Sequence, residues 1–212
     1  MKNRTYILAV LILVLVLALP ITQAQTDPES IREHQIKAAF IYNFIKFIDW
    51  ENEKTPDDSN SITIGIVGGE DFIEAFDPIK SKQVKGKNIV IKQFDEIKKP
   101  NKLRKKNASV WKEKISALKK CQVLFICTCK DEKPEIPVEI LKALERSGVL
   151  VIGETPKFLE NGGIINFIME NKKVRFEINI EAAKHNGLKI SAQLLKLAKR
   201  IITKEKPKDR KS

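Results

Sequence analysis

The chain has 212 residues and a formal net charge of +12, from 39 Lys and Arg against 27 Asp and Glu. This length suits a single domain with a full hydrophobic core. The densest basic stretch, 98–120, holds ten basic residues but one aromatic residue, so the charge does not favour nucleic-acid binding. The remaining interpretations of the charge are a solvated lysine-rich surface, contact with anionic lipid headgroups, or an acidic partner.

The first 24 residues have the pattern of an export signal. Lys2 and Arg4 precede an apolar run at 6–19, which is followed by Pro20 and a small-x-small site ending at Ala24. The run is shorter than the roughly 20 apolar residues that span a bilayer, although an uncleaved membrane anchor is the alternative. We expect cleavage after Ala24 (signal peptide 1–24), a domain over 25–203 and a basic disordered tail over 204–212.

A long helix is predicted over 28–49. Ser30 and Glu33 can cap its start, and its expected buried side is Ile36, Phe40, Phe44, Phe47 and Ile48. The aromatic residues spread more widely than a single apolar stripe. Tyr42, Phe44 and Trp50 are therefore candidates for an exposed partner interface, and the alternative is that another helix or the tail covers them.

Strands and helices alternate through the middle of the chain. The predicted strands are 62–67, 88–92, 123–128 and 149–152, and the predicted helices are 71–80, 109–119 and 137–146. This alternation predicts an α/β fold, in which a mostly parallel central sheet is flanked by helices on both faces. An antiparallel hairpin and a C-terminal helix are expected to complete it.

The hairpin is predicted from two alternating runs, 164–169 and 173–179, which a short polar turn joins. Side chains alternate along a strand, so Arg175, Glu177 and Asn179 share the face opposite the apolar residues of the second run. This polar row is a candidate groove for a ligand or partner. A solvated strand face is the alternative.

Two further elements flank the hairpin. Gly162 and Gly163 turn the chain into it, and they could also permit close approach of a ligand or partner. After the hairpin, Gly187 ends a short helix and Ser191 can cap a second one. The predicted apolar stripe of that second helix is Leu194, Leu195, Leu197, Ala198, Ile201 and Ile202.

The three cysteines lie in or beside one predicted strand. Cys121 and Cys127 are about 20 Å apart along a straight strand, beyond disulfide reach, and we expect Cys121 to be a buried thiol. Cys127 and Cys129 are about 6.6 Å apart on one face, near the outer limit for a bridge. They are candidate redox thiols, and an intramolecular or interchain disulfide stays open. A metal site is not expected, because C-x-C alone supplies too few ligands.

No catalytic set is apparent. The glycine-rich turn at 65–69 lacks the G-x-G-x-x-G spacing and is followed by two acids, so a structural turn is favoured over nucleotide binding. His34 and His185 are not accompanied by a serine nucleophile motif. We expect no enzyme activity, no cofactor and no metal.

Several separated motifs resemble the YfiR family of periplasmic proteins. They are KAAFIYNFIKFIDW at 37–50, the strand and glycine turn at 62–69, KCQVLFIC at 120–127, and GG, RFEIN, GLKIS and LLKLA between 162 and 198. The family usually has Pro after the Trp at the end of the first motif, where this chain has Glu51. The resemblance covers nearly all of the mature chain.

The resemblance implies a periplasmic regulator. A YfiR-like protein binds and represses the sensor domain of an inner-membrane signalling protein. The expected partner here is a diguanylate cyclase, and a histidine kinase is the alternative. Repression of a diguanylate cyclase lowers cyclic-di-GMP synthesis, which controls biofilm formation. Such repression requires only that the inactive conformation of the partner is bound better than the active one. The alternative function is a periplasmic carrier of a small molecule or anionic polymer. A homodimer and contact with an anionic membrane surface stay open.

Overall fold

The computed structural model describes residues 28–51, 60–95, 105–127 and 138–203. The expected signal peptide with Ala24, the basic tail, Cys129 and residues 98–104 of the basic stretch lie outside the described residues.

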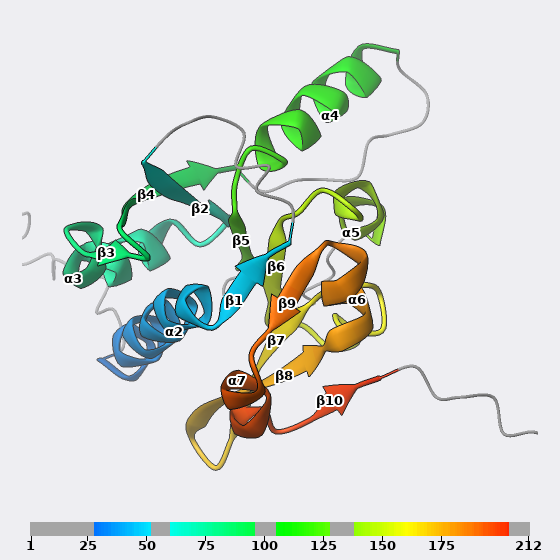
Figure 1. Cartoon of the computed structure of the whole chain (residues 1–212). Helices are drawn as coiled ribbons and strands as arrows, with labels where there is room; N and C mark the ends of the chain where they lie inside the picture. The colour runs from blue at the N-terminus through cyan, green and yellow to red at the C-terminus, as the bar shows by residue number, and fades with distance from the viewer. Residues whose placement is uncertain (1–27, 52–59, 96–104, 128–137, 204–212) are drawn as a thin grey trace, which may run out of the picture.

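A mostly parallel sheet forms the centre of the molecule (Figure 1). Its eight described strands lie in the order β10-β8-β7-β6-β5-β2-β4-β3. Their bounds are β2 Ser61–Val67, β3 Gln83–Val84, β4 Lys87–Phe94, β5 Val123–Ile126, β6 Leu150–Gly153, β7 Ile165–Glu170, β8 Lys173–Asn179 and β10 Ile201–Ile202. Among the described strands of this sheet, only β7 with β8 and β3 with β4 pair antiparallel. The predicted α/β class is therefore confirmed.

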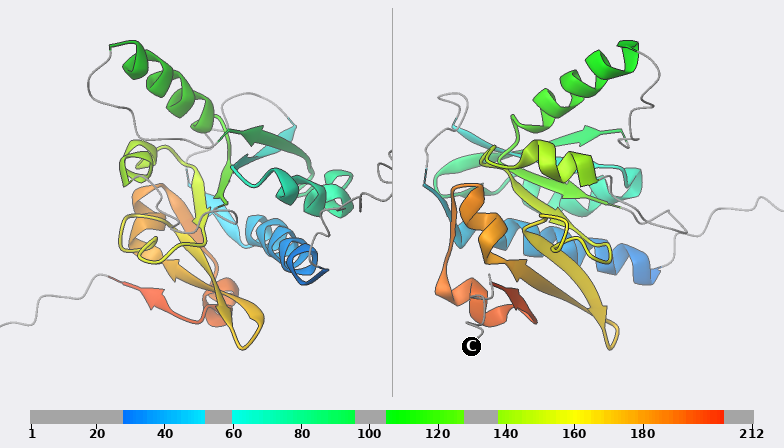
Figure 2. Two further views of the ribbon diagram at one scale, coloured as in Figure 1. Left: turned by 180° about the vertical axis from the view of Figure 1, so that it is seen from behind. Right: turned by 90° about the vertical axis from the view of Figure 1, so that its right-hand side faces the viewer.

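Helices cover both faces of the sheet (Figure 2). They are α2 Pro28–Lys46, η1 Glu70–Phe76, α3 Asp77–Lys80, α4 Lys105–Leu118, α5 Val138–Leu144, α6 Ile180–His185 and α7 Ala192–Leu197. Buried residues of α2, η1, α6 and α7 share one apolar core with the sheet. Buried residues of α4 and α5 share a second core on the other face.

Aromatic rings attach α2 and η1 to the sheet. The ring of Phe44 lies 4.9 Å from that of Phe176 on β8, and the ring of Phe72 lies 4.7 Å from that of Phe125 on β5. Such edge-on and tilted pairs add to the free energy gained by burying the rings. The core is therefore built on the second half of α2, where Ala38, Ile41, Phe44 and Ile45 are buried, whereas the first two turns of the helix are more exposed.

The first helix is shorter than predicted. It ends at Lys46, and Ile48–Trp50 form strand β1, which pairs antiparallel with β9 (Leu188–Ile190). The buried side is also rotated, because Lys37 and Ile41 are buried whereas Ile36 is 37% exposed. The reason is tertiary: the amide of Ser191 donates to the carbonyl of Phe47 at 2.9 Å and holds the chain in an extended form there.

The C-terminal helix is also shorter than predicted. Ser191 caps it as expected, with its hydroxyl accepting from the amide of Leu194 at 3.3 Å, but the helix ends at Leu197. Ile201 and Ile202 instead form β10 beside β8. The amide of Lys199 donates to the carbonyl of Phe176 at 2.8 Å, so the chain satisfies backbone groups at the edge of the sheet.

The hairpin follows the prediction closely. β8 has the predicted bounds, and β7 is shifted by one residue. The connecting residues Asn171 and Lys172 have φ angles of 50° and 59°. Two left-handed residues are the geometry of a type I′ turn, which matches the twist of the flanking strands.

Candidate functional site

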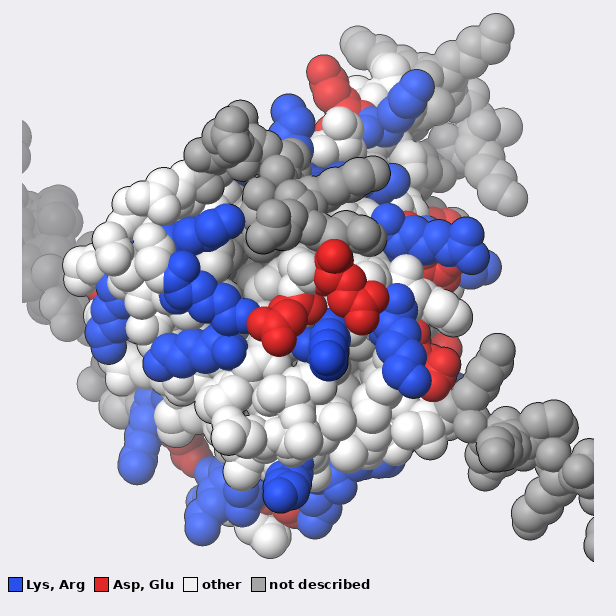
Figure 3. Space-filling view, in the orientation of Figure 1, with Lys and Arg blue, Asp and Glu red and all other residues white. Residues whose placement is uncertain are grey.

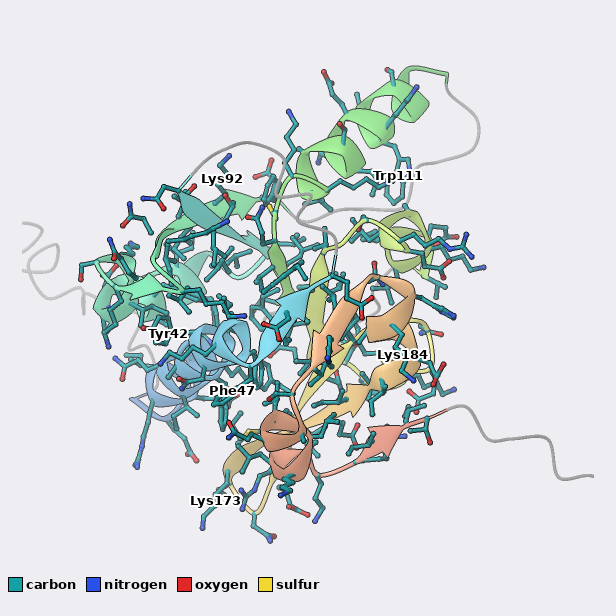
Figure 4. The ribbon with its side chains drawn as sticks, in the orientation of Figure 1. Tyr42, Phe47, Lys92, Trp111, Lys173 and Lys184 are labelled. Atoms are coloured by element: carbon teal, nitrogen blue, oxygen red, sulfur yellow. The ribbon has the colours of Figure 1, made fainter. Side chains whose placement is uncertain are left out.

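A basic aromatic face lies at the C-terminal end of α2. We define it by Tyr42, Trp50, Lys46, Lys82 and Lys85. The ammonium of Lys46 lies 4.2 Å from the centre of the Tyr42 ring, and that of Lys82 lies 5.7 Å from it. Lys85 lies 5.9 Å from the Trp50 ring. Figure 3 shows basic side chains gathered where α2 and β3 lie in Figure 1, and Figure 4 shows Tyr42 at the end of α2. Half-buried rings beside ammonium groups suit contact with an acidic, partly apolar partner.

Hydrogen bonds hold this face in place. The hydroxyl of Tyr42 donates to the carbonyl of Gln83 at 3.2 Å, and the indole of Trp50 donates to the carbonyl of Gly148 at 2.9 Å. Lys85 donates to the carbonyl of Ile48 at 2.7 Å and forms an ion pair with Asp49 at 2.6 Å. The Lys85 hydrogen bond and charge lower the pKa of Asp49. The face is therefore formed in the isolated chain.

Phe44 does not belong to this face. It is fully buried, and its ring contacts Phe40, Phe167 and Phe176. Sequence reasoning placed it with Tyr42 and Trp50 because all three are aromatic. Its position one turn from Ile41 puts it on the core side, where the predicted buried side of the helix also had it, so its candidacy for an exposed interface is wrong.

The polar row of β8 is divided between surface and interior. Arg175 is exposed and Glu177 is half-buried, but Asn179 is only 8% exposed. The side-chain oxygen of Asn179 accepts from the amide of Ala182 at 2.9 Å, and its nitrogen donates to the carbonyl of Leu159 at 2.9 Å. Asn179 is thus the N-cap of α6 and is not available to a partner, which corrects the predicted row of three.

Glu177 has a partner that the sequence did not indicate. The guanidinium of Arg200 donates to both its carboxylate oxygens at 2.8 Å and to Glu160 at 3.0 Å. The hydrogen bonds from Arg200 to Glu177 and then Glu160 raise the pKa of Arg200. Arg200 immediately precedes β10, so the contact depends on a strand that the sequence pattern attributed to a helix. Arg175 and Glu177 face away from the α2 core, on the other side of the sheet from the basic aromatic face.

The paired glycines have a packing role in the structure. A side chain at Gly163 would collide with the ring of Phe158, and one at Gly153 would collide with the same ring. The amide of Gly163 donates to the carbonyl of Phe158 at 2.9 Å, while Gly162 has a φ of 102°. The close approach that these glycines permit is therefore to the chain itself.

The cysteines are in different states. Cys121 is buried and free, as expected, and burial raises its pKa to about 11. Cys127 is disulfide-bonded. Cys129 lies outside the described residues. Gly69, at φ 57°, lies directly against the Cys127 side chain, which gives the glycine turn a structural reason.

A cavity of about 590 Å³ lies between the first half of α2 and the hairpin. Its floor includes Lys37, which is only 5% exposed and pairs with Glu33 and, at 2.6 Å, with Glu154. Burial alone would lower the pKa of Lys37, but the charges and hydrogen bonds of Glu154 and Glu33 outweigh it and raise that pKa. Sequence reasoning missed this site, although Lys37 stands in one helical row with Ile41 and Phe44.

Among the residues that the structure describes, no helix is long and apolar enough to cross a membrane. No group of three or more His, Cys, Asp or Glu side chains among those residues could hold a metal ion.

Comparison with known families decides the classification. The family model DUF4154, described as YfiR/HmsC-like, matches residues 34–199. The chain belongs to this family. The YfiR/HmsC-like family is one of periplasmic, non-catalytic regulators, which act in cyclic-di-GMP signalling. Members interact with an inner-membrane sensor protein of the YfiN type.

One solved structure agrees with the fold. A conserved domain protein from Vibrio cholerae matches with 13% identity and a TM-score of 0.51, over 80% of this chain and 60% of that chain. The chain thus spans about 60% of the solved chain that it matches, and the likeness concerns the fold alone. A domain from Streptococcus pneumonia in complex with L-Trp gives a TM-score of 0.44 at 13% identity, covering 66% of this chain and 55% of that one. A search of curated proteins finds no match.

The YfiR/HmsC-like motifs correspond to defined elements. RFEIN is the second half of β8, GLKIS contains β9, and LLKLA is the end of α7 with its cap. The family's first motif contains most of α2 together with β1. The β1–β9 pair therefore joins the first motif to the GLKIS motif near the other end of the matched region.

Proposed function

We propose that this protein is a periplasmic repressor, which binds the sensor domain of an inner-membrane diguanylate cyclase through the basic aromatic face. The observation that carries this proposal is the cluster of ammonium groups around the rings of Tyr42 and Trp50. Aromatic residues are enriched at the centre of protein interfaces, whereas lysines belong to the polar rim, where their charge attracts an acidic partner.

Repression follows from differential binding. If the face is complementary to the sensor domain in its inactive conformation only, binding shifts the population toward that conformation. Trp50 is held by its hydrogen bond to Gly148, and Lys85 is held by its ion pair with Asp49. These contacts support the mechanism, because a preformed surface loses little side-chain entropy on binding. No catalytic residue is required.

The role of the lysines can be tested by charge reversal. Lys46→Glu together with Lys82→Glu should weaken capture of the sensor protein from intact envelopes at least tenfold, because like charges would then oppose an acidic partner. Lys173→Glu, at the far end of the hairpin (Figure 4), is the matched control and should leave capture unchanged. Equal capture by the double variant and the wild-type protein would exclude this face.

The alternative function, a carrier of a small molecule or anionic polymer, predicts a different result. A carrier would be stabilised by its cargo whether or not a membrane protein is present, since a ligand that binds only the folded state raises its melting temperature. The exposed Arg175 belongs to that hypothesis, as it lies on the opposite side of the sheet from the basic aromatic face. Arg175→Glu should then abolish binding of the cargo without affecting capture of the sensor.

A further inference from the structure

The cavity beside α2 forms because strand β6 ends before its neighbour β7 does. β6 ends at Gly153, which pairs with Asn166, whereas β7 continues to Glu170. The chain leaves β6 through Glu154 and Pro156, and the first turns of α2 lie opposite. Figure 2 shows the start of α2 and the tip of the hairpin at the same end of the molecule. The gap left beside β7 is the cavity of about 590 Å³.

The charges that line this cavity differ from those of the chain as a whole. They are four carboxylates, Glu33, Glu154, Glu160 and Glu177, and three cations, Lys37, Lys157 and Arg200, which leaves an excess of one negative charge. Lys37 and Arg200 are already paired with all four carboxylates. The cavity of a protein with a net charge of +12 is thus suited to a cation and not to an anion.

A buried polar atom in the cavity wall has no partner. Asn166 is only 5% exposed, and its side-chain oxygen has no hydrogen-bond partner among the described residues. A buried carbonyl oxygen that accepts no hydrogen bond is rare in folded proteins, because the loss of water is not compensated. This oxygen requires a donor, which either a water molecule or an N–H group of a ligand can supply.

The part of the wall that β7 contributes after Asn166 is apolar. Phe167 is buried, Ile168 is half-buried and Met169 is 51% exposed, so the side facing solvent offers hydrocarbon surface. The volume falls in the range of pockets that enclose small organic molecules. We propose that this cavity binds a small primary amine with an apolar or sugar body, whose ammonium group donates to Asn166 and neutralises the excess carboxylate charge.

The test uses the mature protein and three amines, namely tyramine, isoamylamine and glucosamine. Calorimetric titration should show saturable binding of at least one of them. 4-Ethylphenol and 4-hydroxyphenylacetate, the uncharged and anionic counterparts of tyramine, should bind at least tenfold more weakly than the amine that binds. If none of the three amines binds at millimolar concentration, or if the counterparts bind as well, the proposal is wrong.

Paired variants locate the binding. Asn166→Leu removes the unpartnered oxygen at little cost to folding, and it should weaken amine binding at least tenfold. Asn186→Leu is the matched control, because Asn186 is equally buried and also has an unpartnered side-chain oxygen, but lies outside this cavity. It should bind the amine like the wild-type protein. Unchanged binding by Asn166→Leu would overturn the proposal and indicate that a water molecule satisfies Asn166.

Discussion

The indole nitrogen of Trp50 donates to the carbonyl oxygen of Gly148 at 2.9 Å, although 98 residues separate them. This bond ties β1 to the segment before β6, and therefore ties the small β1–β9 sheet to the central one. It also fixes the orientation of the Trp50 ring next to Lys85. Stability and partner binding are consequently linked at this residue.

Trp50→Phe should show how much the Trp50–Gly148 hydrogen bond contributes to stability. It keeps an aromatic ring but leaves the Gly148 carbonyl without the indole donor, so the free energy of unfolding should fall by about 1 kcal/mol. Denaturant unfolding measures this change. Trp50→Ala should cost more, since it also removes apolar contact area. Identical stabilities of Trp50→Phe and the wild-type protein would mean that water replaces the indole donor.

Lys37→Met should be among the most destabilising substitutions on α2. It leaves the carboxylate of Glu154, which is 8% exposed, without its cation, and breaking a buried ion pair from one side costs about 3–5 kcal/mol. Lys80→Met is the control, because its ion pair with Asp77 is exposed and should contribute less than about 1 kcal/mol. The double variant Lys37→Met with Glu154→Gln should recover part of the loss.

The same residue predicts a pH dependence. The pKa of Lys37 is raised in the folded state above its usual 10.5, so the folded protein holds this proton more tightly than the unfolded chain does. Its stabilisation is complete below pH 10.5 and is lost as the pH rises through the folded-state pKa. The melting temperature of the wild-type protein should therefore fall more steeply above pH 10.5 than that of Lys37→Met. Parallel curves would contradict the burial of this ion pair.

The packing of Phe158 between two glycines predicts non-additive effects. Gly163→Ala should destabilise the fold by about 1–3 kcal/mol, because the added methyl group collides with the Phe158 ring. Phe158→Leu removes the ring edge that causes the collision. In a double-mutant cycle, the combined variant should therefore lose less stability than the sum of the single variants. Additive losses would show that the clash does not determine the cost.

The thiols should differ in reactivity. Burial raises the pKa of Cys121 to about 11, so this thiol is protonated at neutral pH and should react with maleimide only after unfolding. We propose that the disulfide of Cys127 is formed with Cys129, so that the unreduced, unfolded chain labels at one cysteine. Peptide mapping of the unreduced protein tests this pairing. Labelling at three cysteines would contradict it.

Much of the fold follows from sequence pattern, and the exceptions have a common cause. Alternating residues located the hairpin, and short apolar runs located β2, β5 and β6, because both patterns are local in the sequence. The strands β1, β3, β9 and β10 were missed, since each has only two or three residues. All but β3 also exist through pairing with a distant segment. Such pairing overrides the helical preference of a sequence like that of residues 194–202.

The candidate site was predicted only in part, because its residues come from segments that are distant in the sequence. Tyr42 and Trp50 were selected as aromatic residues outside a single stripe, and both are half-buried at one face. The lysines around them come from α2 and the segment around β3, and nothing in the sequence brings these together. Asn179 was misplaced because strand alternation alone does not show that its side chain caps α6. Phe44 was misplaced because helix periodicity alone does not show how α2 is rotated against the core.

The most direct test of the proposed repression is reconstitution of the mature protein with a membrane-embedded diguanylate cyclase from the same organism. Cyclic-di-GMP synthesis is measured as the protein is added to the periplasmic side. We predict that synthesis falls with wild-type protein and Lys173→Glu, and that Lys46→Glu with Lys82→Glu requires at least a tenfold higher concentration for the same effect. Undiminished synthesis at saturating wild-type protein, or equal repression by the double variant, would contradict the account.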